Sequence, residues 1–304
     1  MDYQQFLRNV LDGLMNIYPE HDISLHSVKK NNGIVLDGIC IKDRDSNIAP
    51  TLYMESFYTM IKSGYCIDEV IKRICSVYES HNDVNLSLDE IADISDFSIV
   101  SKNIYYVVVN YEKNKELLAN CPHRRVHDLA IVYRINIYVG DGLGSVLIKN
   151  EMADNIWHVD EKYLYETAVK NTSTLFCPMV QSMNEVLVEI MHGKDDYNQE
   201  ILDSVCNLDL ERHMLVVSNN ARTAGAGVIF IDEDIQKRVS EVMGGDYIII
   251  PSSVHETIIT DLGEADTIKD MVVEVNKTQV STEDFLSNNI YIYRSDEKRI
   301  QIVI

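Results

Sequence analysis

Hydrophobic and polar positions change their spacing several times along the first 80 residues. Between residues 2 and 17 the apolar side chains recur every three or four positions, which is typical of one face of an amphipathic helix. The stretch "ISLHSVKKNNGIVLDGICIKD" alternates on both sides of Asn32-Gly33, a dipeptide that favours the positive φ angles of a hairpin turn. Helical spacing returns over residues 55–80. The pattern predicts an opening helix, an antiparallel hairpin and a long helical region.

The middle of the chain combines strand patterns with helix patterns. "NIYYVVVNY" is short and rich in β-branched and aromatic residues, which predicts a buried strand, and the following "YEKNKELLAN" has helix-forming composition. "LAIVYRINIYVGDGLGSVLIKN" predicts a second hairpin with Asp141-Gly142 at its turn. Its G-D-G-L-G stretch is not a phosphate-binding loop, because an alternating strand follows where such a loop would open a helix. Two further helices are predicted, with Asp160 and Ser182 as their N-caps.

The pattern is clearest after residue 210. The order of the predicted elements there is ββαββαββ, which indicates an antiparallel sheet with helices on one face and therefore an α+β fold. The polar stretch at residues 192–200 is the predicted boundary, so the chain divides into an N-terminal α+β region, 1–200, and a C-terminal α+β domain, 210–304. The predicted strands are "HMLVVSNN", "AGVIFI", "DYIIIPS", "ETIITD" and the closing hairpin "NNIYIYRSDEKRIQIVI", and the predicted helices are "DEDIQKRVSEVMGG" and "ADTIKDMVVEVNK".

Composition places the chain among cytosolic globular proteins. With 304 residues and 46% apolar side chains it can build a sizeable core, which excludes a wholly disordered protein. The first residues lack the pattern of a signal peptide, and no run approaches the roughly 20 apolar residues of a membrane span, so we expect a cytoplasmic protein without a membrane partner. The six cysteines lie singly, without a C-x-x-C pair, and are expected to be reduced thiols.

The net charge of −21 narrows the classes of partner. Direct binding of nucleic acid is not expected, because such binding relies on clustered Lys and Arg. The acidic residues are spread along the whole chain, which solubility alone explains. The alternative is a surface that docks on a basic protein or imitates nucleic acid.

Three separated segments resemble the bacterial family known as domain of unknown function 5688. They are "NIAPTLYMESFY", "NYEKNKELLANCPHR" with "DLAIVYRI", and "IIIPSSVHETII" with "EVNKTQV". The C-terminal third also looks remotely similar to the YtpQ-like family. Neither resemblance implies an activity or a cofactor; the first implies a bacterial cytosolic protein, and His127 matches none of its motif positions. Those positions are Pro50, Thr51, Tyr53, Glu55, Asn110, Asn114, Pro122, His123, Arg124, Asp128, Pro251, Ser252, Ser253, His255 and Glu256.

"NCPHRRVHDLA" is the densest group of reactive side chains in the sequence. If the segment is helical from Pro122, His123 and His127 share one face at the spacing of zinc-binding histidines, and Asp128 or Glu55 could complete the site. The motif lacks the glutamate of H-E-x-x-H, and its arginines would repel a cation. A helix start whose polar groups bond to neighbouring backbone or to a carboxylate is therefore the favoured interpretation, and no metal is predicted.

The adjacent arginines, Arg124 and Arg125, have two interpretations. Guanidinium groups bind carboxylate or phosphate in a bidentate fork, so the pair could clamp an anionic ligand. In a chain this acidic, an internal Asp or Glu is the nearer anion, and we favour an internal ion pair.

"PSSVHE" brings two serines, His255 and Glu256 together. In a strand, Ser253 and His255 would share a face about 7 Å apart, which is too far for a hydrogen-bonded nucleophile and base. We favour a bend between two strands whose serines bond to local backbone. Glu55 could act as a general acid or base, but a glutamate that begins a helix more often interacts with the helix dipole.

Three hypotheses for function follow, and the sequence leaves open whether the protein is an enzyme. The first is a non-enzymatic module that binds a protein partner through its acidic surface or a strand edge. The second is a hydrolase-like enzyme, with or without a metal ion, in which Glu55, His123 and Asp128 converge in one cleft. The third is a nucleic acid mimic that inhibits a host or defence protein, against which the interspersed Lys and Arg residues count.

Overall fold

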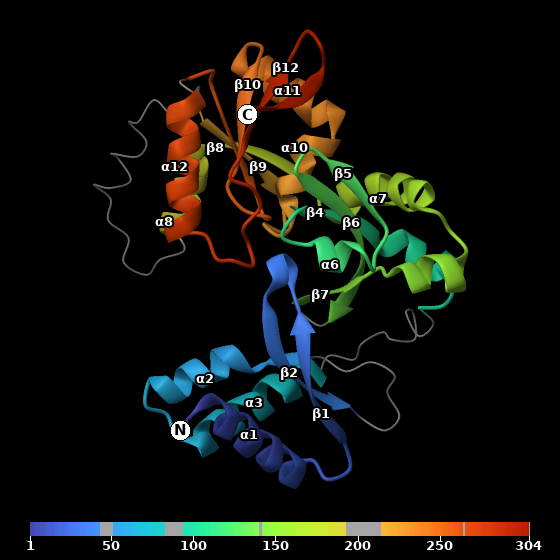
Figure 1. Cartoon of the computed structure of the whole chain (residues 1–304), viewed down its shortest axis with the longest axis vertical. Coiled ribbons are helices and arrows are strands. Elements are labelled where there is room, and N and C mark those ends of the chain that lie inside the picture. Colours follow the sequence, from blue (N-terminus) through green and yellow to red (C-terminus); the bar gives the residue numbers. More distant parts are fainter. Residues whose placement is uncertain (43–50, 83–93, 140–141, 193–213, 264, 304) are drawn as a thin grey trace. The chain divides into compact units, whose positions relative to one another are not determined.

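Antiparallel sheets with helices packed on them give the described part of the chain the α+β fold that the sequence predicts (Figure 1). The chain divides into two units, the first made of residues 1–92 and 137–144 and the second of residues 93–136 and 145–304. The computed structural model describes residues 1–42, 51–82, 94–139, 142–192, 214–263 and 265–303.

The described residues of the first unit form a three-stranded sheet, three α-helices and a 3₁₀ turn (Asn31–Gly33). Its strands lie in the order β1-β2-β3, all antiparallel. Buried side chains one turn apart on α1, such as Phe6, Val10 and Leu14, pack in one core with Ile39 of β2 and Ile74 of α3. The elements are α1 (Tyr3–Ile17), β1 (Asp22–Lys29), β2 (Val35–Lys42), β3 (Thr51–Tyr53), α2 (Met54–Lys62) and α3 (Ile67–Asn82).

Local sequence signals place most of these elements correctly. The predicted opening helix is α1, and the predicted hairpin is β1 and β2, joined where Asn32 (φ 57°) and Gly33 (φ 75°) take positive φ angles. The predicted helical region at 55–80 is two helices instead of one. Residues 63–66, with Gly64 at φ 99°, separate α2 from α3, because glycine adopts this conformation without the steric penalty of a Cβ atom.

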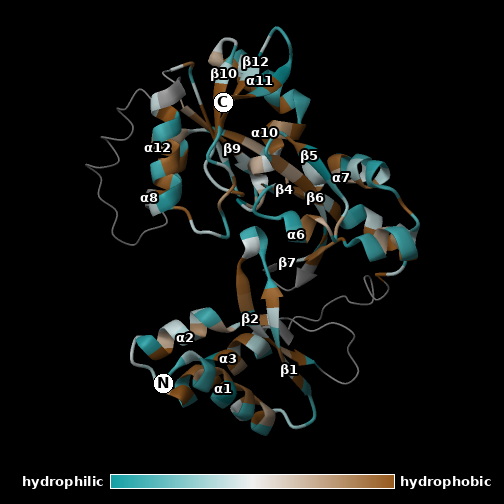
Figure 2. Ribbon diagram, viewed as in Figure 1, coloured by the Kyte–Doolittle hydropathy of each residue, from teal (hydrophilic) through white to brown (hydrophobic). Residues whose placement is uncertain are grey.

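The second unit contains two sheets. In one, β4, β6 and β5 lie in that order and β7 pairs with β6; in the other, six strands lie in the order β13-β12-β10-β11-β9-β8. Figure 2 colours β4 and β6 as largely hydrophobic, and every residue of β4 is buried, as "NIYYVVVNY" predicts. The strands are β4 (Ile104–Asn110), β5 (His123–Val126), β6 (Leu129–Val139), β7 (Gly142–Leu147), β8 (Pro178–Ser182), β9 (Met214–Asn219), β10 (Tyr247–Pro251), β11 (Thr257–Thr260), β12 (Ile290–Arg294) and β13 (Arg299–Val303).

Helices of the second unit start where the sequence predicts caps. Asp160 accepts a hydrogen bond from the backbone N–H of Tyr163 (2.8 Å), and the Ser182 hydroxyl accepts one from the backbone N–H of Glu185 (3.2 Å). No described helix is both long and apolar enough to span a membrane. The helices are α5 (Phe97–Val100), a 3₁₀ turn (Ser101–Asn103), α6 (Lys115–Leu118), a π-helix (Glu151–Trp157), α7 (Glu161–Leu175), α8 (Met183–His192), a 3₁₀ turn (Gly225–Gly227), α10 (Val228–Ile231), α11 (Glu233–Met243) and α12 (Ala265–Thr278).

The predicted strand "AGVIFI" is wrong: the segment forms a 3₁₀ turn and the short helix α10. Val228, Ile229 and Phe230 are consecutive and all buried, and a short apolar run of this kind fits a buried helix as well as a strand. The sixth strand of the sheet is β8 instead, so from residue 214 the order is βααββαββ. The helix predicted after "NIYYVVVNY" is reduced to the single turn of α6.

The predicted boundary at residues 192–200 falls almost wholly in 193–213, outside the described residues. The units that the structure forms differ from the predicted regions 1–200 and 210–304: β8, before the predicted boundary, pairs with β9 after it. Residues 141 and 206, which hold the hairpin aspartate and one cysteine, also lie outside the described residues.

Asp246, just before β10, makes the second unit sensitive to acid. Its carboxylate accepts hydrogen bonds from the backbone N–H and hydroxyl of Ser295 and from Arg294, each 2.8 Å long. These bonds, the backbone N–H first, lower the pKa of Asp246 from 3.8 to about 2. A pKa that is lower in the folded state stabilises the fold above pH 4, and this contribution is lost as the pH falls toward 2.

We therefore expect Asp246→Asn to lower the urea midpoint of unfolding at pH 5 and to have a much smaller effect at pH 2. Denaturation of both proteins at the two pH values, followed by circular dichroism, measures this difference. An equal gap between wild type and variant at both pH values would contradict the role of the ionised carboxylate.

Candidate functional site

The segment "NCPHRRVHDLA" folds as a turn followed by a strand. His123–Val126 is β5, which pairs with β6, and His127 lies in the turn between them with a φ of 57°. The predicted helix start at Pro122 is therefore wrong, and His123 and His127 do not share a helix face. The His127 ring packs on Tyr291 instead, with 5.5 Å between ring centroids. Across the described ranges, no group of three His, Cys, Asp or Glu side chains could hold a metal ion.

His123 has a defined tautomer when neutral. Its Nδ1 lies 3.0 Å from the carbonyl oxygen of Cys121, and because a carbonyl only accepts, Nδ1 carries the proton. The lone pair of the neutral ring is therefore on Nε2. His123 is half-buried and lines a hollow of the surface.

Arg124 forms the internal ion pair that the sequence favours. Its Nε and Nη2 donate to the two carboxylate oxygens of Glu161 at 3.1 and 2.9 Å, and its guanidinium stacks 3.9 Å from the centre of the Tyr165 ring. The Tyr133 hydroxyl also donates to Glu161. Burial alone would raise the pKa of Glu161, but the bonds from Arg124 and Tyr133 outweigh burial and lower it. Glu161 is therefore ionised and already bound on both oxygens.

Asp128 joins its own turn to the segment before β12. Its Oδ2 accepts from the Ser287 hydroxyl (2.6 Å) and the Asn289 amide (2.9 Å), and its Oδ1 accepts from the Tyr291 hydroxyl. Asp128 does not line the hollow to which His123 belongs. The carboxylate acts as an anchor between two parts of the second unit.

Glu55 lies in the first unit, at the start of α2, with a single hydrogen-bonded oxygen. Its Oε1 accepts from the backbone N–H of Asp37 (2.8 Å) and from the Tyr3 hydroxyl (3.1 Å). Burial, followed by the charge of Glu55, raises the pKa of Tyr3. The three residues of the hydrolase hypothesis thus have separate surroundings. Glu55 is bound by residues of the first unit, Asp128 is bound by the side chains at 287, 289 and 291, and His123 lines a hollow to which Asp128 does not belong.

The segment "PSSVHE" forms the predicted bend between β10 and β11. The Ser253 hydroxyl accepts from the backbone N–H of His255 (3.0 Å). Nδ1 of His255 accepts from the backbone N–H of Ala224 (3.2 Å), so the proton is on Nε2 and points to Asp284 Oδ1, 3.1 Å away. Both ring nitrogens are occupied, and His255 has no free lone pair with which to activate Ser253.

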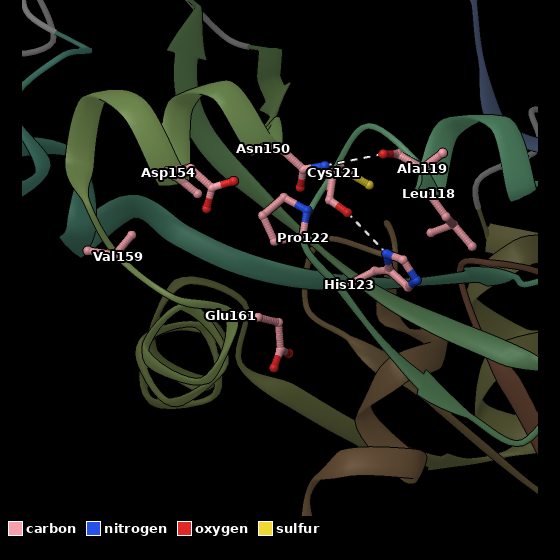
Figure 3. A pocket seen from close by; sticks show the side chains of 10 residues that line it. Leu118, Ala119, Cys121, Pro122, His123, Asn150, Asp154, Val159 and Glu161 are labelled. Atoms are coloured by element: carbon pink, nitrogen blue, oxygen red, sulfur yellow. Dashed lines mark hydrogen bonds between the residues drawn. The ribbon is translucent and has the colours of Figure 1, made fainter.

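Three hollows adjoin one another along the π-helix and the first turns of α7. The first has a volume of about 350 Å³, and Figure 3 shows the side chains that line it. The second, of about 560 Å³, shares Val159 with the first, and the third, of about 350 Å³, shares Tyr163 and Glu166 with the second. We name this surface the α7 face. Its lining residues are Ser101, Lys102, Leu118, Ala119, Cys121, Pro122, His123, Asn150, Ala153, Asp154, His158, Val159, Asp160, Glu161, Lys162, Tyr163, Glu166, Thr167, Lys170 and Asn171.

Tyr163, which lines the α7 face, packs in a cluster of aromatic side chains. Tyr163 is 52% exposed, yet its ring packs on Phe97 with 5.7 Å between centroids, and Phe97 packs on Trp157 at 5.4 Å. The indole N–H of Trp157 donates to a backbone carbonyl (2.9 Å). Ile156, next to Trp157 in the π-helix, is 46% exposed. Tyr163 and Ile156 are thus two large exposed side chains, and the Tyr163 ring is held by its packing on Phe97.

The α7 face carries both signs of charge. Its lining residues include four acidic side chains (Asp154, Asp160, Glu161 and Glu166) and three lysines (Lys102, Lys162 and Lys170). Lys162 lies 3.9 Å from Glu166, and Glu161 is paired with Arg124. Asp154 of the first hollow and Asp160 of the second are both exposed, and they add negative charge to this part of the face.

Cys121 lines the first hollow but is not a nucleophile. The residue is 2% exposed, and burial raises the pKa of its thiol to about 11. We expect iodoacetamide at pH 7.5 to label the exposed Cys66 and Cys177 and to leave Cys121 unlabelled until the protein is denatured. Peptide mass spectrometry of the labelled protein measures this. Equal labelling rates for Cys121 and Cys66 in the native protein would contradict a buried, protonated thiol.

Comparison with known proteins identifies one family. Residues 3–295 match the family described as "Family of unknown function (DUF5688)". No curated protein and no solved structure matches the chain. The remote similarity of the C-terminal third to the YtpQ-like family stays a prediction.

Proposed function

Because the chain belongs to DUF5688, a family of unknown function, the family supplies no activity, and we propose from the chain's own residues that it is a non-catalytic protein-binding module. The observation that carries this proposal is the α7 face, where three hollows adjoin one another and the exposed Tyr163, packed on Phe97, lines two of them. Hollows of this kind accept the anchor side chains of a protein partner.

The bonding of the reactive side chains also favours binding over catalysis. A hydrolase needs a nucleophile or an activated water beside a base with a free lone pair. Glu161 and His255 are each bound on both polar atoms, and the Cys121 thiol is protonated. His123 keeps a lone pair on Nε2, but Asp128, its proposed partner, is bound to the segment before β12.

The chemistry of the α7 face indicates the kind of partner. Tyr163 offers a large contact surface at low entropic cost, because Phe97 already restricts its ring. The exposed carboxylates of Asp154 and Asp160 would attract a basic group of the partner and raise the rate of association. We therefore propose a protein partner that presents an apolar anchor flanked by Lys or Arg. Direct binding of nucleic acid or membrane is not part of this proposal.

Replacing Tyr163 with serine tests the proposal. We expect recovery of a co-purifying partner from native-host lysate to fall at least about tenfold, since anchor residues contribute more than 1.4 kcal/mol to binding. Tyr65→Ser is the matched control, because Tyr65 is 51% exposed and lies in the first unit. Quantitative mass spectrometry of tagged wild type and both variants measures the difference.

The same capture experiment can contradict the proposal. Equal recovery of every partner by the Tyr163→Ser and Tyr65→Ser variants would mean that the α7 face does not bind the partner. A small molecule bound in place of a protein, and chemically changed in a His123-dependent way, would favour the hydrolase hypothesis.

A further inference from the structure

Along its outer edge, β13 pairs with no other strand of the described part of the chain. β13 is the last strand of the six-stranded sheet and pairs on one side with β12. Within the described ranges, no strand pairs with its other side. An unpaired strand edge offers a row of N–H and C=O groups to any other strand.

The sequence of β13 does not protect this edge. Edge strands are usually blocked by proline, by a bulge or by an inward-pointing charge, most often lysine. The opposite edge strand, β8, begins with Pro178, which has no backbone N–H. In β13 the residues are Arg-Ile-Gln-Ile-Val, and all after Arg299 are half-buried. The one charged side chain, Arg299, is paired with Glu297 of the preceding turn.

The residue pattern of β13 is complementary to itself in an antiparallel arrangement. With a two-fold axis at Gln301, Gln301 faces its own copy, Ile300 faces Ile302 of the second chain, and Arg299 faces Val303. This register pairs all five residues, places two apolar pairs on one face and opposes no like charges. Centring the axis on Arg299 would instead oppose two arginines.

We propose that β13 pairs with β13 of a second copy of this chain, antiparallel about a two-fold axis at Gln301. The two six-stranded sheets then form one continuous sheet across the dimer. β13 contains no acidic residue, and the carboxylate beside it, that of Glu297, accepts from Arg299 and from the Gln301 amide (2.8 Å) of its own chain. A five-residue seam is short, and the dimer is therefore concentration-dependent. This self-association is independent of the protein-binding function proposed for the α7 face.

Charge reversal at the two-fold axis tests the register. Gln301→Lys and Gln301→Glu each place two like charges opposite each other across the seam, whereas a mixture of the two variants pairs opposite charges. Sedimentation velocity of the full chain at about 100 µM should show wild type at twice the 34.8 kDa chain mass, each variant alone as a monomer, and the mixture again as a dimer. The control, Val242→Lys at a 55% exposed position on α11, should remain dimeric.

Other results overturn the proposal. If the wild type is a monomer at this concentration, β13 does not pair with a second copy of the chain. This holds even if another molecule binds the β13 edge. Dimers that persist in both single variants, or a mixture that stays monomeric, would place the dimer contact or its axis away from Gln301. Circular dichroism of each variant checks that the fold is retained.

Discussion

Replacing Asp128 with alanine is expected to lower the free energy of unfolding by about 3 kcal/mol, because three hydrogen-bond donors lose a charged acceptor at once. The donors lie about 160 residues further along the chain: Ser287 and Asn289 precede β12, and Tyr291 belongs to it. Tyr291 is fully buried, so its hydroxyl would be left without this partner inside the protein. Asp128→Asn keeps the shape of the side chain and one acceptor oxygen, and its loss should be intermediate.

Urea denaturation followed by tryptophan fluorescence and circular dichroism measures the effect. Asp270→Ala is a suitable control, since Asp270 is exposed on α12 and its loss should change the free energy of unfolding by less than about 0.5 kcal/mol. If Asp128→Ala were as stable as this control, Asp128 would be free for a role in catalysis or binding.

Replacing Gly225 with alanine is expected to cost about 2 to 4 kcal/mol by steric overlap. A Cβ atom at this position would lie 2.6 Å from the Ser218 hydroxyl oxygen, 2.8 Å from the backbone nitrogen of Asn219 and 2.8 Å from the carbonyl oxygen of His255. Two of these atoms belong to backbone that hydrogen bonds hold in place: the His255 carbonyl accepts from the Gly225 N–H (3.0 Å) and from Ser218 (2.8 Å). The His255 carbonyl therefore cannot shift away from the added Cβ atom without losing these hydrogen bonds.

Gly263→Ala is the matched control for this substitution. The nearest atom to a Cβ at Gly263 is the Cδ1 of Ile268 at 3.4 Å, which is an ordinary contact with a flexible side chain. Thermal unfolding should show a large fall in melting temperature for Gly225→Ala and a small change for Gly263→Ala. Equal melting temperatures would mean that the loop after β9 adapts to a side chain and does not need glycine.

Much of the fold is predictable because its signals are local. Asn32-Gly33 specifies its turn by positive φ angles, and Asp160, Ser182 and Asp232 specify helix starts by capping backbone N–H groups of the next turn. The strand predicted at "AGVIFI" failed because Val228 and its neighbours are buried on all sides, which removes the periodicity that distinguishes strand from helix.

The candidate site was harder to predict because its contacts are not local. Arg124 and Glu161 are 37 residues apart, and Asp128 bonds to residues about 160 positions away, so no spacing rule identifies either pair. The proline of "NCPHRR" favours a helix start, whereas pairing of His123–Val126 with β6 decides the structure. The π-helix has no sequence signature of its own, and Tyr163 carries no motif that distinguishes it from the other 16 tyrosines.

Site-specific photo-crosslinking tests the central claim, that the α7 face binds a protein, most directly. A benzophenone amino acid replaces Tyr163 in one variant and the equally exposed Tyr65 in the other, and both are irradiated in cells of the native host. We expect a discrete protein adduct at position 163 that is missing at position 65, with a contacting peptide rich in Lys or Arg beside an apolar residue. No adduct at position 163, or the same adducts at both positions, would contradict it.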